Sequence, residues 1–310
     1  QGYLRHESSY KRKVIGLPEP LKVRIITLGH FWESPFWADY QKFLQSHLQK
    51  DPRIFSGKDW GKTEMETMIR QKRRAEKLYG EEFVWVSDDG SAATDSIHPD
   101  LTVGATQHLI PDELLPLYTQ SWGAGKHCQL KYKFSDGKVE WTTQRNSQLM
   151  GDRRSFPSLC LIHLSTVQAF LRKEGLLGRW RDGVEFGTWI SYNIPIAING
   201  DDVSLALPRS CVKKYLDYKS NLWKLNANKT FVDRTLFGIN SQMWRELPNG
   251  AALKVPLTRW ALVLKRGTAR GNKDPTVINV ATADCLPDYR KFVLDQALVH
   301  WRKQLRFLDQ

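Results

Sequence analysis

The stretch IPIAINGDDVSLAL, residues 194–207, decides the fold. Two β-prone runs, residues 194–198 and 203–207, flank the polar segment Asn199-Gly200-Asp201-Asp202. Because Asn-Gly is favoured in the tight turns that join antiparallel strands, this pattern predicts a β-hairpin with two aspartates at its tip. Taken alone, such a segment is more often a plain turn than a metal site, since aspartate is common beside turns.

A third aspartate follows another predicted strand. Residues 83–86 are apolar and β-prone, and Ser87-Asp88-Asp89 comes directly after them. Strand ends and hairpin tips hold side chains on rigid supports, and aspartate oxygens suit magnesium or manganese. Two aspartate-bearing turns on adjacent strands would provide the paired-cation site that nucleotidyl transfer uses. Helix capping by Asp88, Asp89 or Asp95 is the plainer alternative.

The other segments mix helices and strands. An Asp136-Gly137 turn between residues 131–134 and 139–141 predicts a second hairpin. Thr63 and Glu66 resemble a capping box, and Gly80 is a helix stop. Further strands are expected at 21–26 and near 231, and helices at 63–79, 99–120 (interrupted near Pro111), 158–173, 209–223 and 288–308. Hairpins without regular βαβ alternation predict an α+β architecture.

Charge and cysteine content narrow the class of protein. The 310 residues include 46 Lys plus Arg and 33 Asp plus Glu, a net charge of +13, which favours polyanionic partners such as nucleic acid. A soluble basic protein without such a partner is the alternative. The four cysteines (Cys128, Cys160, Cys211 and Cys285) form no CxxC pair, which argues against structural zinc. Disulfides stay open, although a reduced intracellular protein fits better. No apolar run approaches the roughly 20 residues of a membrane span.

Five motifs, in order along the chain, resemble those of viral RNA-dependent RNA polymerases, most like the ourmia-like and narna-like lineage. The motifs are 21–27 (a basic fingers motif), 87–95 (first palm motif), 146–151 with 155–160 (second), Gly200-Asp201-Asp202 (third), and 226–229 with 238–241 (fourth). The resemblance covers roughly residues 18–245. A lone Gly-Asp-Asp is weak evidence, whereas five ordered motifs with workable spacing form a strong signal.

The resemblance implies an α+β fold, the right-hand polymerase core, with fingers, palm and a partial thumb. The palm would be an antiparallel sheet backed by helices. Residues 1–86 would be a fingers segment, 87–245 the palm with inserted fingers elements, and 246–310 the start of the thumb or a C-terminal helical segment.

The resemblance also assigns roles to single residues. Asp89, Asp201 and Asp202 would be the catalytic metal ligands, and Lys229 would donate a proton to the leaving pyrophosphate. The incoming NTP would contact Lys22, Arg24, Asp95 and Ser155, with Asp95 recognising the ribose 2′-hydroxyl. Asp88 falls where the family has a small neutral residue, so it ranks below Asp89.

The implied function is template-directed RNA synthesis in viral genome replication, by nucleotidyl transfer with two Mg²⁺ or Mn²⁺ ions. The implied partners are the RNA template, nascent RNA, NTPs, and viral or host replication proteins. The implied location is the host cytoplasm, with the mitochondrion as an alternative. Two rival functions remain open: a reverse transcriptase, and a catalytically degenerate RNA-binding relative.

Four further residues depart from the family pattern, and three of them, Gly90, Ser147 and Asp152, motivate the degenerate alternative. Gly90 replaces an apolar residue, Ser147 replaces a glycine, Asp152 adds a negative charge near template-contacting backbone, and His163 replaces an asparagine that helps select ribose. The basic helix 70–77 and the basic residues Arg302, Lys303 and Arg306 fit phosphate contacts and solvated surface equally well. The 12 tryptophans fit base stacking less well than they fit the core.

Overall fold

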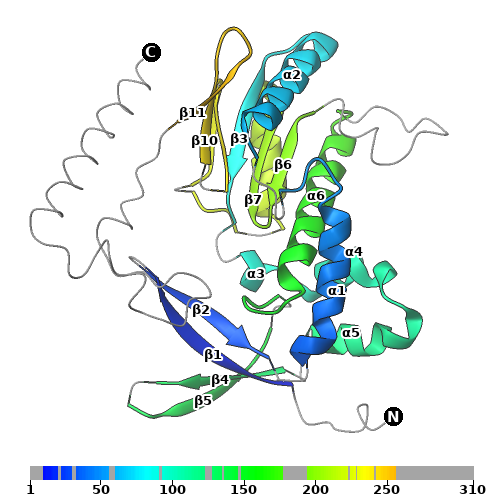
Figure 1. Ribbon diagram of the computed structural model, residues 1–310, viewed down its shortest axis with the longest axis vertical. Coiled ribbons are helices and arrows are strands. Elements are labelled where there is room, and N and C mark those ends of the chain that lie inside the picture. The colour runs from blue at the N-terminus through cyan, green and yellow to red at the C-terminus, as the bar shows by residue number, and fades with distance from the viewer. Residues whose placement is uncertain are drawn as a thin grey trace, which may run out of the picture.

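A computed structural model describes residues 10–19, 22–29, 33–55, 60–90, 93–122, 128–134, 136–145, 148–176, 194–222, 224–227, 229–240 and 242–255. The described residues form three β-sheets with helices packed against them (Figure 1). The helix expected at 288–308, with Arg302, Lys303 and Arg306, lies outside the described residues. No helix in the described part of the chain is long and apolar enough to cross a membrane.

The central sheet carries the hairpin that the sequence predicted. Its strands, in the order β6-β7-β3-β8, are β6 (Ile196–Asn199), β7 (Asp202–Pro208), β3 (Phe83–Asp88) and β8 (Phe231–Asp233), and all neighbours are antiparallel. Every residue of β3 is buried, and β7 and β8 pair with its two edges. Burial of both faces explains why residues 83–86 form an apolar run that does not alternate.

Three helices complete the core of this sheet: α2 (Lys62–Tyr79), α6 (Ser155–Lys173) and α8 (Val212–Ser220). Met65 of α2, Val167 of α6 and Tyr215 of α8 are completely buried in one cluster with the strands. The expected capping box at Thr63 and Glu66 is wrong by two positions. Helix α2 starts after Gly61, whose backbone N–H donates to Glu64, so Thr63 already lies inside the helix. The expected stop at Gly80, with φ 66°, is confirmed.

The second sheet has the order β2-β1-β4-β5, with strands β1 (Tyr10–Glu19), β2 (Lys22–Leu28), β4 (Cys128–Lys133) and β5 (Val139–Thr143). Strands β4 and β5 form the expected hairpin, in which Gly137 takes φ 86°. The edge strand β2 meets the loop before α6, where the Thr27 backbone N–H donates to the Met150 carbonyl at 2.7 Å. In Figure 1 this sheet lies apart from the central sheet, with the chain before α6 between them.

Shorter elements fill the remaining sides. Helix α1 (Glu33–Leu48) packs along α6, and the short helices α3 (Ala93–Ser96), α4 (Pro99–Thr106) and α5 (Leu115–Ser121) lie near it in Figure 1. As expected, the helical region 99–121 is broken near Pro111, where two 3₁₀ turns (Gln107–Leu109 and Asp112–Leu114) replace the α-helix. Another 3₁₀ turn (Arg209–Cys211) leads into α8. The third sheet contains β9 (Leu236–Ile239), β10 (Gln242–Glu246) and β11 (Ala252–Val255).

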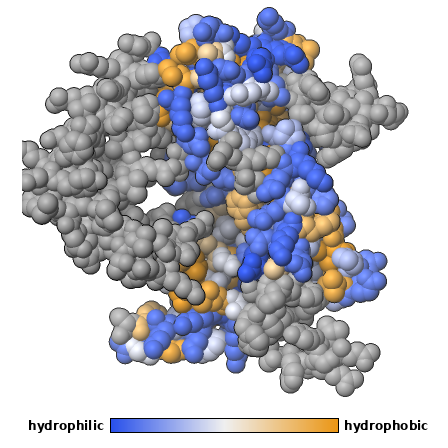
Figure 2. All heavy atoms as spheres, viewed as in Figure 1, coloured by the Kyte–Doolittle hydropathy of each residue, from blue (hydrophilic) through white to orange (hydrophobic). Residues whose placement is uncertain are grey.

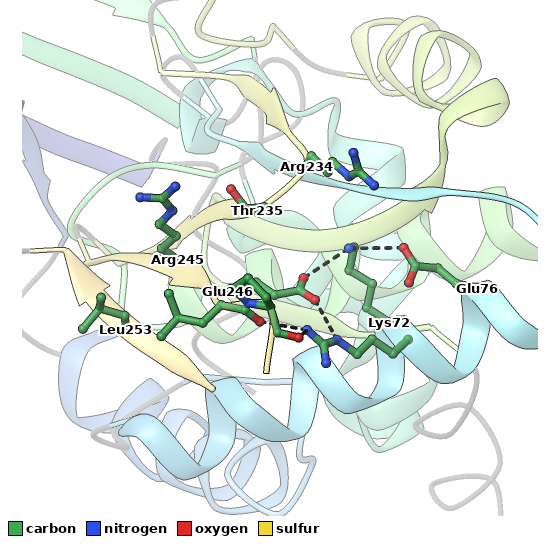
Figure 3. Close-up of a pocket in the computed structure, with 10 residues that line it drawn as sticks. Lys72, Glu76, Arg234, Thr235, Arg245, Glu246 and Leu253 are labelled. Carbon is green, nitrogen blue, oxygen red and sulfur yellow. Dashed lines mark hydrogen bonds and ion pairs between the residues drawn. The ribbon is translucent and has the colours of Figure 1, made fainter. Parts of the chain in front are cut away.

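The basic side chains of α2 divide between structural and exposed positions. Lys72 is 4% exposed and pairs with Glu246 of β10 at 3.1 Å, while Arg73 binds the same carboxylate at 2.9 Å. These contacts form one side of a pocket of about 570 Å³ between α2 and the third sheet, and none of Asp89, Asp201 and Asp202 lines it (Figure 3). Lys72 and Arg73 therefore join α2 to β10 and are not free for phosphate.

The predicted division into fingers, palm and thumb stays a prediction. Its first boundary, at residue 86, falls within β3, whose residues 83–88 belong to the central sheet. Its second boundary, at residue 245, falls within β10.

Candidate active site

The hairpin tip holds Asp201 at its turn and Asp202 at the start of β7. Asn199 pairs with Asp202, so the two turn residues are Gly200 and Asp201. Gly200 has φ 67°, and Asn199 and Asp201 have no positive φ. This matches the two-residue turn that begins with glycine, not the expected Asn-Gly turn, so the register of the turn prediction was wrong by one residue. The hairpin itself is confirmed.

Three carboxylates meet at this tip. One ligand oxygen each from Asp89, Asp201 and Asp202 lies within 4.8 Å of the other two. Asp89 arrives here because β3 pairs with β7 and its last residue, Asp88, lies opposite Val203. Asp89 is 8% exposed and the other two are half-buried. Residues that are 112 positions apart in the sequence thus share one site.

The absence of a side chain at Gly90 is explained by how closely this residue packs against Ala93 and Asp201. A Cβ atom at position 90 would lie 2.7 Å from the Ala93 Cβ and 3.4 Å from the Asp201 Cβ. A larger residue would therefore push against the carboxylate cluster. The departure from the apolar residue of the family pattern allows the close approach of the two aspartate-bearing segments.

The crowding of the carboxylates changes their acidity. Burial, together with a hydrogen bond to Asp89 and the charge of Asp201, raises the pKa of Asp202 to about 7. Burial and the charge of Asp89 also raise the pKa of Asp201. Negative charge held this closely without compensation is unfavourable, so the cluster favours a bound proton or a cation. Hard divalent cations with oxygen ligands fit this donor set.

Two neighbouring residues contact Asp89 from the segment after α8. Lys229 Nζ lies 2.7 Å from the Asp89 carboxylate, and this hydrogen bond raises the pKa of Lys229. The Asn226 backbone N–H donates to the Asp89 carbonyl at 2.9 Å, and its side-chain amide reaches the carboxylate at 3.4 Å. The sequence motif pointed to Lys229, whereas the hydrogen bonds of Asn226 were not expected.

Helix α6 supports the turn from behind. The His163 Nδ1 donates to the Gly200 carbonyl at 2.9 Å, and the Gly200 N–H donates to Cys160 Sγ at 3.2 Å. His163 is completely buried, and burial lowers its pKa to about 4, so the ring is neutral at pH 7. His163 stands where the family has a ribose-selecting asparagine, and in this protein it binds the backbone of the hairpin turn.

Asp88 points away from the cluster into a closed ionic group. Its carboxylate accepts a hydrogen bond from Tyr215 at 2.8 Å and contacts the ammonium group of Lys219, which also contacts His163 Nε2. Tyr215, Lys219 and His163 are all completely buried. Burial lowers the pKa of Lys219, and the carboxylate in contact acts in the opposite direction. The alternating faces of a strand separate Asp88 from Asp89, so of these two residues only Asp89 belongs to the carboxylate cluster.

The charge of Asp152 is compensated by two arginines. Its carboxylate pairs with Arg12 of β1 at 2.9 Å and with Arg154 at 2.6 Å. These two guanidinium groups hold the pKa of Asp152 well below its usual range despite its burial. The negative charge that the sequence places near template-contacting backbone is therefore neutralised within the protein. Asp152 instead joins the second sheet to the start of α6.

Of the four residues predicted to contact the NTP, the structure describes the side chains of Arg24 and Ser155. The positive charge of Arg24 lies near enough to Asp201 to offset part of the rise in its pKa, and Arg24 Nη1 contacts Met150 Sδ at 3.7 Å. Ser155 is 3% exposed and donates to the Leu149 carbonyl at 2.9 Å, so its hydroxyl supports the loop. Lys22 lies two residues before Arg24 on β2, but the side chains of Lys22 and Asp95 are not among those that the structure describes. Ser147 also lies outside the described residues.

No known protein-family model matches the chain. A search of curated proteins gives the RNA-dependent RNA polymerase of Ourmia melon virus (isolate Melon/Iran/VE9), 31% identical over 278 residues. The chain resembles a viral RNA-dependent RNA polymerase. This match confirms the resemblance that the ordered motifs indicated. It covers 81% of this chain and 30% of the viral polymerase, so the chain spans less than a third of that relative's length.

Solved polymerase structures share the fold at low sequence identity. The RNA-dependent RNA polymerase of a human picobirnavirus has a TM-score of 0.54 and 15% identity, covering 87% of this chain and 49% of that one. An apo telomerase from Candida tropicalis, truncated from its C-terminal domain, has a TM-score of 0.55 and 11% identity, covering 79% of this chain and 55% of that one. These likenesses confirm the right-hand polymerase core as the fold.

Proposed function

We propose that this chain is the catalytic core of an RNA-directed RNA polymerase that replicates a viral genome. The reaction is transfer of a nucleoside monophosphate from an NTP to an RNA 3′-hydroxyl, directed by an RNA template, with release of pyrophosphate. The observation that carries this proposal is the meeting of Asp89, Asp201 and Asp202 at the tip of the palm hairpin. The sequence identity to a viral RNA-dependent RNA polymerase supports RNA as template and product.

The three carboxylates are the ligands that magnesium or manganese would have. When bound there, such ions would supply the positive charge that activates a 3′-oxygen and stabilises a leaving pyrophosphate. The raised pKa values of Asp201 and Asp202 support this fit, because a cation relieves the repulsion that raises them.

The chain's own groups position the reactants. The guanidinium group of Arg24 is close enough to influence Asp201 and would bind the triphosphate of an NTP, and Lys22 lies two residues before it in β2. Asp95 would accept the ribose 2′-hydroxyl, and Ser155 would act through the loop that it supports. Lys229 is held beside the carboxylates, in position to donate a proton to the leaving group. Replication would take place in the host cytoplasm or the mitochondrion, together with viral or host replication proteins.

The test is ribonucleotide incorporation on a primed RNA template with magnesium or manganese, in the intact chain and in Asp201→Asn. The matched control is Asp217→Asn, which removes an exposed carboxylate on α8. We expect extension that depends on the template, disappears in Asp201→Asn and persists in Asp217→Asn. Equal extension in all three proteins would contradict the role of Asp201.

Deoxyribonucleotides distinguish the reverse-transcriptase alternative in the same assay. The palm fold alone does not separate the two activities, since the telomerase structure also has this fold. Preferential incorporation of deoxyribonucleotides would overturn the proposal in favour of that alternative. RNA binding that is unchanged in Asp201→Asn, without turnover in any protein, would overturn it in favour of a degenerate RNA-binding relative.

A further inference from the structure

One tryptophan differs from the others whose side chains the structure describes. Trp141 of β5 is 46% exposed. The other five are between 0% and 7% exposed: Trp37, Trp60, Trp85, Trp122 and Trp244. Trp141 lies in an edge strand whose residues are all exposed, so packing does not account for its large apolar surface.

Two lysines from neighbouring strands reach the ring of Trp141. The ammonium groups of Lys11 and Lys131 each lie 5.5 Å from the ring centroid. Lys131 is the direct cross-strand partner of Trp141, and Lys11 comes from β1 on the far side of β4. Cations over an aromatic ring are stabilised by it, so this aromatic surface and two positive charges stay together.

Further basic residues lie on the face of the sheet that carries Trp141. The register places Lys13 in line with Lys131 and Trp141, and Lys133 lies two residues further along β4. Among the residues of this face whose side chains the structure describes, none is acidic. The opposite face is different, because there Val14, Leu130 and Tyr132 pack around Leu149. In Figure 2, hydrophilic and hydrophobic residues lie side by side at the end of the molecule where Figure 1 places β4 and β5.

This face leads toward the carboxylate cluster. Arg24 of β2 pairs with Leu17 of β1, and Leu17 lies four residues after Lys13. Because side chains alternate along a strand, Leu17, Lys13 and Arg24 all lie on the face that carries Trp141. Four residues of strand separate the level of Lys13 from that of Leu17, about 13 Å. A few nucleotides of an extended strand cover such a span, and Arg24 is one of the charged residues close enough to Asp201 to influence it.

We propose that Trp141, with Lys11 and Lys131, is a stacking platform for single-stranded RNA that enters or leaves the active site. A base would stack on the exposed indole, and the flanking ammonium groups would bind the adjacent phosphates. Aromatic side chains combined with positive charge bind single strands in this way, with little sequence preference. The platform rests on the proposed function for the identity of the nucleic acid, but its binding role is measurable without catalysis.

The test is binding of labelled single-stranded RNA by fluorescence anisotropy in EDTA, so that turnover plays no part. Trp141→Ala should weaken binding roughly fivefold or more, while Trp141→Phe keeps most of the affinity. Lys11→Gln with Lys131→Gln should lower the slope of log K against log salt by about 1.4, the value for two phosphate contacts on a single strand. An RNA of the same length with abasic positions should bind Trp141→Ala and the unchanged chain equally.

Matched controls carry the same changes at other exposed positions. Phe43→Ala removes a 51% exposed aromatic ring on α1, and Lys50→Gln with Lys213→Gln removes two exposed charges, one from the turn after α1 and one from α8. Both controls should bind RNA like the unchanged chain. Equal RNA affinity in Trp141→Ala and the unchanged chain would overturn the platform. Loss of self-association in Trp141→Ala, with RNA affinity unchanged, would also overturn it and assign this edge to a second copy of the chain.

Primed-template extension separates this inference from the proposed function. At saturating RNA, Trp141→Ala should extend at the rate of the unchanged chain, and only the RNA concentration needed for half-maximal rate should rise. RNA binding that depends on Trp141 in a chain without polymerase activity would support the platform and count against the proposed function alone. A lower rate at saturating RNA, with unchanged RNA affinity, would overturn the platform.

Discussion

The Nδ1 atom of His163 lies 2.9 Å from the carbonyl oxygen of Gly200, the residue before the two hairpin aspartates. The same imidazole contacts the ammonium group of Lys219 through Nε2, and Lys219 contacts the Asp88 carboxylate beside Asp89. One buried group thus contacts both segments that carry the site's carboxylates. Two departures from the family pattern, Asp88 and His163, belong to this single group and fit each other.

The first prediction concerns the stability of this buried group. Lys219→Met removes the cation and leaves the Asp88 carboxylate buried without it, which should lower the free energy of unfolding by about 3–5 kcal/mol. Urea denaturation followed by circular dichroism measures the change. Adding Asp88→Asn to Lys219→Met should recover part of the loss, because the buried charge disappears. A double variant less stable than Lys219→Met would contradict the pairing.

The second prediction concerns pH and metal binding. The folded chain keeps the Asp202 proton up to pH about 7, whereas the unfolded chain loses it near pH 4, so the metal-free protein should become less stable as pH rises between these values. A cation that binds the carboxylates competes with this proton. Magnesium should therefore raise the melting temperature more at pH 8 than at pH 5.5, as measured by differential scanning fluorimetry. Asp202→Asn should reduce the pH dependence of the magnesium effect, and a magnesium effect equal at both pH values would contradict the metal site.

The third prediction concerns the contact between β2 and the loop before α6. Gly151 has φ 108°, and a Cβ there would lie 2.4 Å from the Thr27 carbonyl oxygen. Gly151→Ala should therefore lower the free energy of unfolding by at least about 1–3 kcal/mol. Gly104→Ala is the matched control, because its Cβ would meet open space in α4, and it should be neutral or stabilising by up to about 1 kcal/mol. Equal melting temperatures for the two variants would show that the contact is looser than the structure has it.

The fourth prediction separates two roles of Lys229. If Lys229 donates the leaving-group proton, Lys229→Met should slow incorporation by about 100-fold. Because its ammonium group lies 2.7 Å from Asp89, the same change should leave metal affinity unchanged or increase it. Single-turnover rates and a magnesium titration measure the two effects. Lys229→Arg is the control that keeps the positive charge. Full activity in Lys229→Met would contradict the role as proton donor and leave Lys229 only as the partner of a surface ion pair with Asp89.

Sequence alone predicted the parts of the fold that depend on local pattern. The two hairpins, the helix stop at Gly80 and the break near Pro111 follow from turn residues and apolar periodicity. The order of the motifs predicted that Asp89 and Asp201 lie in one site, and in the structure their carboxylates lie close together. The turn register was wrong because Asn-Gly and Gly-Asp are both good turn pairs, and only the pairing of Asn199 with Asp202 decides between them.

The supporting residues could not be predicted in this way. Lys219 reads as one more basic residue of a basic helix, and only the packing of α8 against α6 buries it beside Asp88. The ion pair that neutralises Asp152 could not be predicted, because its partner Arg12 is 140 residues away in the sequence. Trp141 could not be distinguished from the core tryptophans, because exposure depends on where the edge of a sheet falls.

The central position of β3 has a consequence for how the chain folds as it is synthesised. Both strands that flank β3, β7 and β8, lie more than 110 residues later in the sequence, so β3 leaves the ribosome long before either partner exists. An apolar strand without its partners is prone to aggregate, and pairings between strands so far apart in the sequence form slowly. The nascent chain must therefore protect β3 in the interval, and α2, which precedes it and packs against it, is the element already available to do so.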